Sequence, residues 1–144
     1  MTSSVFPDVN VWLALSSPDH QHFPVAWSWY RNLPEETVLV FCRITQLSFL
    51  RLLTTQAAMG AGTLTQSEAW AAYDRWRFEA EAGFLDEPTD LEAAFRALTG
   101  ALRASPKEWA DAYLAAFAEL AGLRLVTFDR ALAARVPYAI LLGE

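Results

Sequence analysis

Short apolar runs alternate with longer segments of helical periodicity along the whole chain. The clearest run is 37–41, which is bounded by turn signals and almost wholly apolar, as expected for a strand buried on both faces. Apolar runs at 4–9 and 123–128 predict two further strands. Shorter runs at 83–85 and 138–142 predict a minimal strand and a last strand.

Apolar residues recur at helical spacing between these runs, and capping patterns mark where two of the helices begin. Thr65 and Glu68 form one capping-box pattern. Ser105 and Glu108 form another, with Pro106 at the first helical position. The expected helical segments are 10–15, 21–33, 44 to before the turn at 60–62, 65–81, 89–102, 105–120 and 129–135.

The alternation of short strands with helices predicts one α/β domain over residues 1–144, with a parallel sheet that helices cover on both faces. A length of 144 residues lies within the usual range for one domain and is enough to bury a core. No internal repeat, low-complexity tract or linker interrupts the pattern.

The composition says more about the cellular compartment of the protein than about its function. A single cysteine, Cys42, and the lack of a signal-like segment predict a cytoplasmic protein, and no apolar run approaches the ~20 residues of a membrane-spanning helix. The net charge of −6 argues against loose coating of nucleic acid through a broad basic face. It does not exclude a nucleic-acid substrate, because acids gathered around a cation leave local arginines free to contact phosphate.

Two aspartates end predicted strands: Asp8 follows the first apolar run, and Asp129 follows the run at 123–128. If both strands belong to one parallel sheet, their carboxylates emerge together at its carboxyl edge, where open α/β sheets bind ligands. Asp111 lies in the second turn of the helix predicted at 105–120 and could join them. Convergent carboxylates suggest a divalent metal ion. Helix capping is the alternative for both strand-end acids, and solvation is the alternative for Asp111.

Four motifs follow one another along the chain. They are Asp8-Val9-Asn10-Val11-Trp12-Leu13-Ala14-Leu15, Ile44-Thr45-Gln46-Leu47-Ser48-Phe49-Leu50-Arg51-Leu52-Leu53-Thr54, Asp111-Ala112-Tyr113-Leu114-Ala115-Ala116 and Thr127-Phe128-Asp129-Arg130. In this order the motifs resemble those of the PIN-domain family, and most closely the VapC toxins of bacterial and archaeal type II toxin–antitoxin modules. The resemblance spans essentially the whole chain.

The resemblance implies a three-layer α/β/α fold around a short-stranded parallel sheet and a Mg²⁺- or Mn²⁺-dependent endoribonuclease. Asp8, Asp111 and Asp129 match the acidic metal ligands of the family, and Asn10 and Thr127 match polar positions beside the site. It also implies an RNA substrate, a cognate antitoxin protein as partner and a homodimer.

Gln46 stands where many family members carry a glutamate. Glutamine offers only a neutral carbonyl oxygen, so the site holds one formal negative charge fewer and would bind a second ion less well. Glu108, one turn before Asp111, is a possible substitute acid, although the capping pattern also explains it. The main alternative to a nuclease is therefore a PIN-fold RNA- or protein-binding module of weakened catalytic power. A structural domain that only oligomerises is a further alternative.

Basic and aromatic residues suggest where partners could bind. Arg51 and Arg130 are candidates for contacts with RNA phosphate. Arg51 could equally lie along a surface helix, and solvation is the alternative for Arg130. Arg43 and Lys107 are further charged neighbours of the predicted site, for which solvation is the competing explanation. The aromatic stripe at 70–77 is typical of a core, and the alternatives are a dimer or antitoxin surface and stacking of nucleobases.

Overall fold

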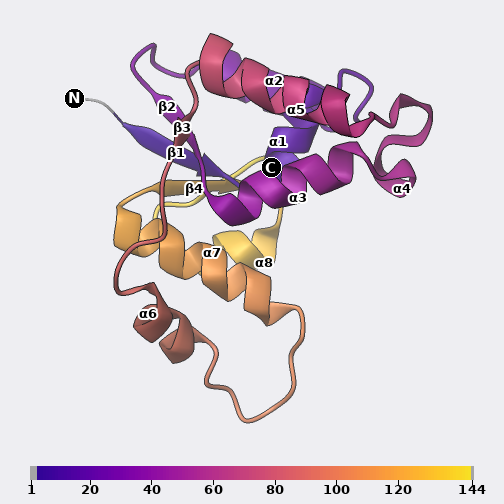
Figure 1. Ribbon diagram of the computed structural model, residues 1–144. Helices are drawn as coiled ribbons and strands as arrows, with labels where there is room; N and C mark the ends of the chain where they lie inside the picture. The colour runs from indigo at the N-terminus through magenta and orange to yellow at the C-terminus, as the bar shows by residue number, and fades with distance from the viewer. Residues whose placement is uncertain (1–2, 144) are drawn as a thin grey trace.

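A parallel sheet of five strands, in the order β3-β2-β1-β4-β5, forms the centre of the fold (Figure 1). The structure is a computed structural model that describes residues 3–143. Its strands are β1 (Ser4–Pro7), β2 (Val38–Phe41), β3 (Gly83–Phe84), β4 (Arg124–Thr127) and β5 (Ile140–Leu141). Every predicted strand exists and is shorter than its apolar run. Because β1 lies between β2 and β4, its carboxyl end is in the middle of the sheet edge.

Side chains of the central strands alternate between two cores, one on each face of the sheet. The first core receives Val5, Leu39, Phe41 and Val126, and the second receives Phe6, Val40 and Leu125. All of these side chains are buried. The strands are therefore apolar on both faces, which explains why they appear in the sequence as continuous runs.

Helices cover both faces of the sheet, which confirms the predicted three-layer α/β/α architecture (Figure 1). The first core lies under α1 (Val9–Ser16), α2 (Phe23–Arg31), α3 (Arg43–Leu53) and α5 (Gln66–Asp74). The second core lies under α6 (Leu91–Leu98), α7 (Glu108–Ala121) and α8 (Arg130–Ala133). Three shorter segments complete the chain: α4 (Gln56–Met59), the 3-10 turn η1 (Gly60–Gly62) and the π-helical turn η2 (Arg75–Glu79).

Stacked aromatic rings hold the helices against the sheet. Trp12 of α1 stacks on Phe41 of β2 with ring centroids 3.8 Å apart, and Phe117 of α7 stacks on Phe6 of β1 at 5.2 Å. All four rings are fully buried. Aromatic pairs of this kind contribute about 0.5–1.5 kcal/mol beyond the area that they bury. The second pair fixes α7, and with it Asp111, relative to the strand that carries Asp8.

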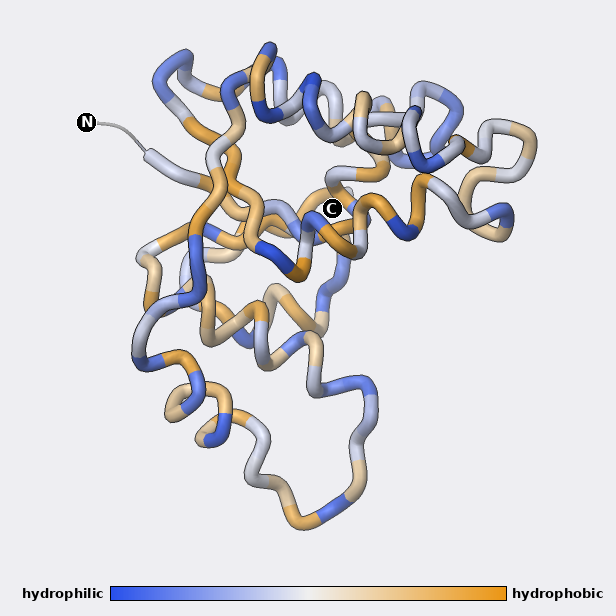
Figure 2. The backbone as a smooth tube through the Cα atoms, viewed as in Figure 1, coloured by the Kyte–Doolittle hydropathy of each residue, from blue (hydrophilic) through white to orange (hydrophobic). Residues whose placement is uncertain are grey.

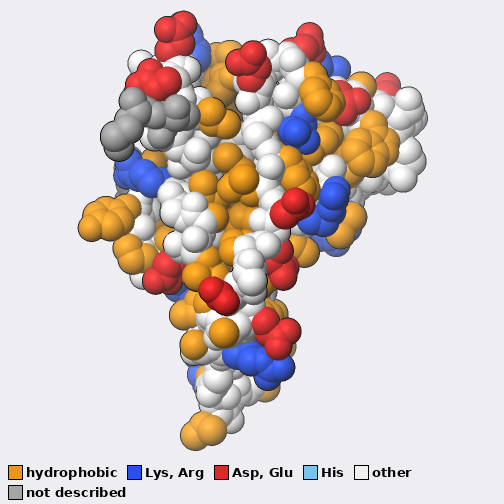
Figure 3. Space-filling model, turned by 60° about the vertical axis from the view of Figure 1, so that its left-hand side comes forward, with side chains coloured by type: hydrophobic (Ala, Val, Ile, Leu, Met, Phe, Trp, Pro, Cys, Tyr) orange, Lys and Arg blue, Asp and Glu red, His pale blue; other side chains and the backbone are white. Residues whose placement is uncertain are grey.

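The helix predicted at 89–102 ends at Leu98, so its predicted end was wrong. The hydroxyl of Thr99 donates a hydrogen bond to the carbonyl of Phe95 at 2.8 Å, and Gly100 follows. A side chain that bonds to the backbone and a glycine both disfavour continuation of a helix. The helix and the loop after it project from the body of the molecule (Figures 1 and 3).

The two capping-box predictions had different outcomes. The box at Thr65 is confirmed: the Glu68 amide donates to the Thr65 hydroxyl at 3.1 Å, and the Thr65 amide donates to the Glu68 carboxylate at 2.8 Å. The box at Ser105 was wrong, because α7 begins only at Glu108 and its N-cap, Lys107, makes no side-chain capping bond. The Glu108 amide donates instead to the backbone carbonyl of Ser105 at 3.1 Å, which closes a turn. Asp111 therefore lies in the first turn of α7 and not in the second.

Hydropathy follows this architecture. Apolar segments concentrate along the strands and on the inner turns of the helices, and hydrophilic segments lie on outer turns and loops (Figure 2). Among the helices of residues 3–143, none combines the length and the apolar character that crossing a bilayer would require.

Candidate metal centre at the carboxyl edge of the sheet

Asp8 directly follows β1 and caps α1. One carboxylate oxygen, Oδ1, accepts hydrogen bonds from the backbone amides of Asn10 at 3.0 Å and Val11 at 3.3 Å. The other oxygen, Oδ2, accepts a short hydrogen bond from the hydroxyl of Thr127. The side chain is only 5% exposed, and no ion pair with a basic residue balances its charge among the described residues.

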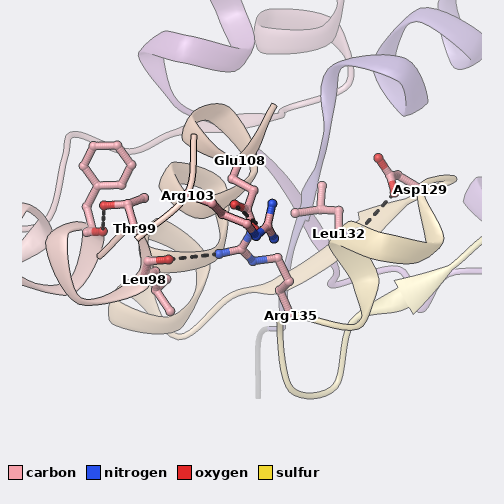
Figure 4. Close-up of polar contacts among 8 residues, drawn as sticks. Leu98, Thr99, Arg103, Glu108, Asp129, Leu132 and Arg135 are labelled. Atoms are coloured by element: carbon pink, nitrogen blue, oxygen red, sulfur yellow. Dashed lines mark hydrogen bonds and ion pairs between the residues drawn. The ribbon is translucent and has the colours of Figure 1, made fainter. Parts of the chain in front are cut away.

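Thr127 connects Asp8 to the second strand-end acid. Its fully buried hydroxyl donates to Asp8 and accepts a hydrogen bond from the backbone amide of Asp129 at 2.9 Å. The Asp129 carboxylate caps α8 by accepting a hydrogen bond from the amide of Ala131 at 2.9 Å. It also accepts one from the amide of Leu132 at 3.1 Å (Figure 4). Both strand-end aspartates are therefore helix caps, as the capping alternative predicts. Capping uses only Oδ1 of Asp129, and within the described chain Oδ2 makes no hydrogen bond.

The three aspartates are coupled electrostatically. Burial raises the pKa of Asp8 above its ordinary value, and the charge of Asp129 raises it further, against the lowering effect of the hydrogen bond from Thr127. Burial and the charge of Asp129 also raise the pKa of Asp111, while Arg135 and Lys107 lower it. The charge of Asp129 thus raises the pKa of both other aspartates, as expected where acids share one anionic site.

Asp111 and Asp129 line one depression together with Lys107, Glu108, Ala131 and Arg135. Arg135 lies 3.6 Å from the Glu108 carboxylate, and Arg103 lies 4.0 Å from it (Figure 4). Arg135 also donates to the Leu98 carbonyl at 3.4 Å. A hydrogen bond from Ser105 and the two arginines lower the pKa of Glu108. Glu108 is therefore engaged by arginines, although it faces the same depression as the two aspartates.

The carboxylates are adjacent but not converged. Within residues 3–143, no three Asp, Glu, His or Cys side chains lie close enough together to hold one ion. The carboxylate of Asp111 makes no hydrogen bond to any other described residue, so the side chain can rotate without breaking one. Ligation of one ion by all three aspartates would require such a rotation.

Gln46 is buried, with 7% exposure, and its amide oxygen accepts a hydrogen bond from Nη1 of Arg43. The guanidinium of Arg43 in turn lies 4.7 Å from the centre of the Phe84 ring. Asn10 is exposed, and its bond in this region is the one from its backbone amide to Asp8. The predicted neutral residues therefore differ: Thr127 is built into the acidic site, whereas Gln46 is bonded to a cation.

The predicted RNA-contacting arginines lie apart from each other. Arg51 lines a separate depression between α3 and α5 with Leu47 and Trp70. Arg130 is exposed in the first turn of α8, directly after Asp129. Sequence reasoning missed Arg135, which lies beside Asp111 and Glu108. Its contact with Glu108 joins residues 27 positions apart, and no local motif signals it.

The sequence matches known proteins over the span of this fold. The profile of the PIN domain matches residues 5–137, which include Asp8, Asp111 and Asp129. The chain is a PIN-domain protein. Ribonuclease VapC41 of Mycobacterium tuberculosis is 43% identical over 136 residues, which cover 86% of this chain and 88% of that protein.

Solved structures share the PIN-domain fold at low sequence identity. VapC20 of Mycobacterium tuberculosis, described as a toxin that cleaves the sarcin–ricin loop, superposes with a TM-score of 0.64 at 19% identity, covering 90% of this chain and 93% of that chain. A toxin–antitoxin complex from Klebsiella pneumoniae superposes with a TM-score of 0.61 at 17% identity, covering 94% of this chain and 95% of that chain. The parallel sheet and its flanking helices are therefore the PIN-domain architecture.

Proposed function

We propose that this PIN domain is a metal-dependent endoribonuclease and the toxin of a type II toxin–antitoxin pair. The observation that carries the proposal is the buried carboxylate of Asp8, which Thr127 joins to the backbone of Asp129. An anion buried without a basic partner in the described chain calls for a cation from solution. The 43% identity to Ribonuclease VapC41 supports RNA as the substrate.

The donor set fits Mg²⁺ or Mn²⁺. Asp8, Asp111 and Asp129 offer hard carboxylate oxygens, which are the ligands that these ions prefer. When bound, the ion would lower the pKa of a water molecule and stabilise negative charge on the scissile phosphate. Thr127 keeps the Asp8 carboxylate oriented, and Lys107 and Arg135 are near enough to Asp111 to contact an RNA phosphate.

Cleavage by the purified chain, free of any partner protein, tests this function. We expect labelled RNA to be cut in Mn²⁺ and not in chelator. The variant Asp111→Asn should lose cleavage at unchanged thermal stability, because the carboxylate of Asp111 makes no hydrogen bond in the described chain. If the wild-type chain cuts no RNA in Mg²⁺ or in Mn²⁺, or if Asp111→Asn cuts as well as wild type, the proposal is wrong.

One observation favours a second function, a PIN-fold binding module without catalysis. Gln46 supplies no fourth carboxylate, and its amide oxygen is already bonded to Arg43. Calorimetric titration with Mn²⁺ distinguishes the two functions. The nuclease requires binding that depends on Asp111, whereas the binding module predicts RNA or protein binding that is unaffected by metal and by Asp111→Asn.

We also propose an antitoxin partner and a homodimer. Toxin–antitoxin complexes among the structural relatives support the first. For the second, Leu47 of α3 and Trp70 of α5 are 61% and 49% exposed and line one depression, an apolar face that suits self-association. Light scattering should report a dimer that Leu47→Asp dissociates. The matched control is Leu102→Asp, because Leu102 is fully exposed in the projecting loop.

A further inference from the structure

A cluster of arginines and aromatic rings occupies the part of the sheet edge beside the acids. Along the carboxyl edge, the strand order β3-β2-β1-β4 places Phe84 at β3, Arg43 just after β2, Asp8 after β1 and Asp129 after β4. The edge is therefore cationic and aromatic over two strands and anionic over the next two. Neighbouring strands are about 4.8 Å apart, so the two parts of the edge are close together.

Arg43 and Arg77 both approach the ring of Phe84. The guanidinium carbons lie 4.7 Å and 5.7 Å from its centre. Arg77 is on the π-helical turn η2 and is held by hydrogen bonds to the Ala82 carbonyl at 3.0 Å and to the Tyr73 hydroxyl at 3.1 Å. Its guanidinium also lies 5.4 Å from the ring of Phe78, which is 71% exposed. We call Arg43, Phe84, Arg77 and Phe78 the arginine ledge.

The positive charge of the arginine ledge is not neutralised within the described chain. Neither Arg43 nor Arg77 forms an ion pair with any described carboxylate, in a protein whose net charge is −6. Gln46 matters here, because it holds Arg43 through a neutral oxygen. A glutamate at that position would pair with the guanidinium and cancel its charge.

We propose that the arginine ledge binds the single-stranded RNA substrate next to the scissile phosphate. The proposal rests on the nuclease function proposed above and adds the path of the strand: along the carboxyl edge, from the acids to Arg43 and on to Phe78. Arg43 contacts the phosphate next to the one that is cut, and Phe78 stacks on a base. A positively charged path with interleaved aromatic rings is how proteins hold single strands without reading their sequence.

The test measures binding of a short, fluorescently labelled single-stranded RNA by anisotropy over a series of salt concentrations. All chains carry Asp129→Asn, so that RNA is not cut while the α8 cap is kept. Arg43→Gln should weaken binding about tenfold and reduce the slope of log affinity against log salt by about 0.7, the value for one lost phosphate contact to a single strand. Phe78→Ala should weaken binding about tenfold without changing that slope.

Arg31→Gln is the matched control, because Arg31 is an exposed arginine at the end of α2 and lies outside the ledge. It should change neither affinity nor slope. If wild type cuts RNA but Arg43→Gln binds like Arg31→Gln, the ledge is overturned and the nuclease function stands. If Arg43→Gln weakens only the complex with an antitoxin, the ledge is a protein surface and the RNA assignment is wrong. If wild type neither binds nor cuts RNA, both proposals fail.

Discussion

Asp129 is the residue at which capping and metal binding can be separated. The variants Asp129→Asn and Asp129→Ala differ in only one of the two roles. Asparagine keeps a side-chain oxygen that can accept the amides of Ala131 and Leu132, now 2.9 Å and 3.1 Å away, but it lacks the negative charge. Alanine removes both the cap and the charge.

The expected magnitudes follow from these contacts. Loss of an aspartate N-cap costs about 1 kcal/mol, whereas asparagine caps equally well. For a chain of this size, 1 kcal/mol lowers the melting temperature by about 2–4 °C. In chelator we therefore expect Asp129→Ala to melt about 2–4 °C below wild type, and Asp129→Asn to melt with wild type.

In the presence of metal, both variants should instead fall below wild type. An ion that binds only the folded chain stabilises it by about 2.7 kcal/mol at a concentration of 100 Kd. Urea unfolding of wild type in Mn²⁺ should show a gain of this size, and both variants should lose most of it. RNA cleavage should fall in both variants alike.

Two results would refute this reasoning. If Asp129→Asn gains as much stability from Mn²⁺ as wild type does, the carboxylate is not a ligand. If Asp129→Asn loses as much stability in chelator as Asp129→Ala, the charge matters for the cap itself, and the two roles cannot be separated at this residue.

Three further predictions concern the residues around Asp129. Thr127→Val leaves the buried Oδ2 of Asp8 without its donor and should cost about 1–3 kcal/mol, more than Thr127→Ser, which keeps the hydroxyl; urea unfolding that ranks them the other way contradicts the bridging role. Burial raises the pKa of Asp8 in the folded chain, so the folded state binds the proton more tightly than the unfolded state does. In chelator, the free energy of unfolding should therefore fall as pH rises above about 4, and Asp8→Asn should flatten this fall. If Asp8→Asn shows the same pH dependence as wild type, the prediction is wrong. Gln46→Glu alone should not bind a second Mn²⁺, because Arg43 pairs with the new carboxylate. The double variant Gln46→Glu with Arg43→Gln should bind a second ion. If calorimetry gives the same stoichiometry for both variants, the prediction is wrong.

The sequence predicted the strands well because burial on both faces leaves a strong local signal. The helix ends were harder to predict, because they depend on capping hydrogen bonds. The residue types alone do not decide whether such a bond forms; the path of the backbone does. Ser105 and Glu108 have the residue types of a capping box, yet the chain closes a turn there and the helix starts later. Thr65 and Glu68 have the same pattern and form the box.

The candidate site was predictable only in part for the same reason. Asp8 and Asp129 could be placed from the sequence, because parallel strands bring their carboxyl ends to one edge. The hydrogen bond from the Thr127 hydroxyl to Asp8 joins residues 119 positions apart, and no local pattern in either segment predicts it. The arginine contact with Phe84 depends in the same way on β3 pairing with β2, which only the fold reveals.

The sheet order also sets when the site comes into existence during synthesis. Asp8 is made first, but β4 can pair with β1 only after residues 124–127 have been made. Until then neither Thr127 nor Asp129 exists to complete the acidic edge. A ribosome that stalls before the codon for Asp129 therefore releases no fragment with all three acids. A cell that makes this protein is exposed to the assembled site only after the codon for Asp129 has been translated.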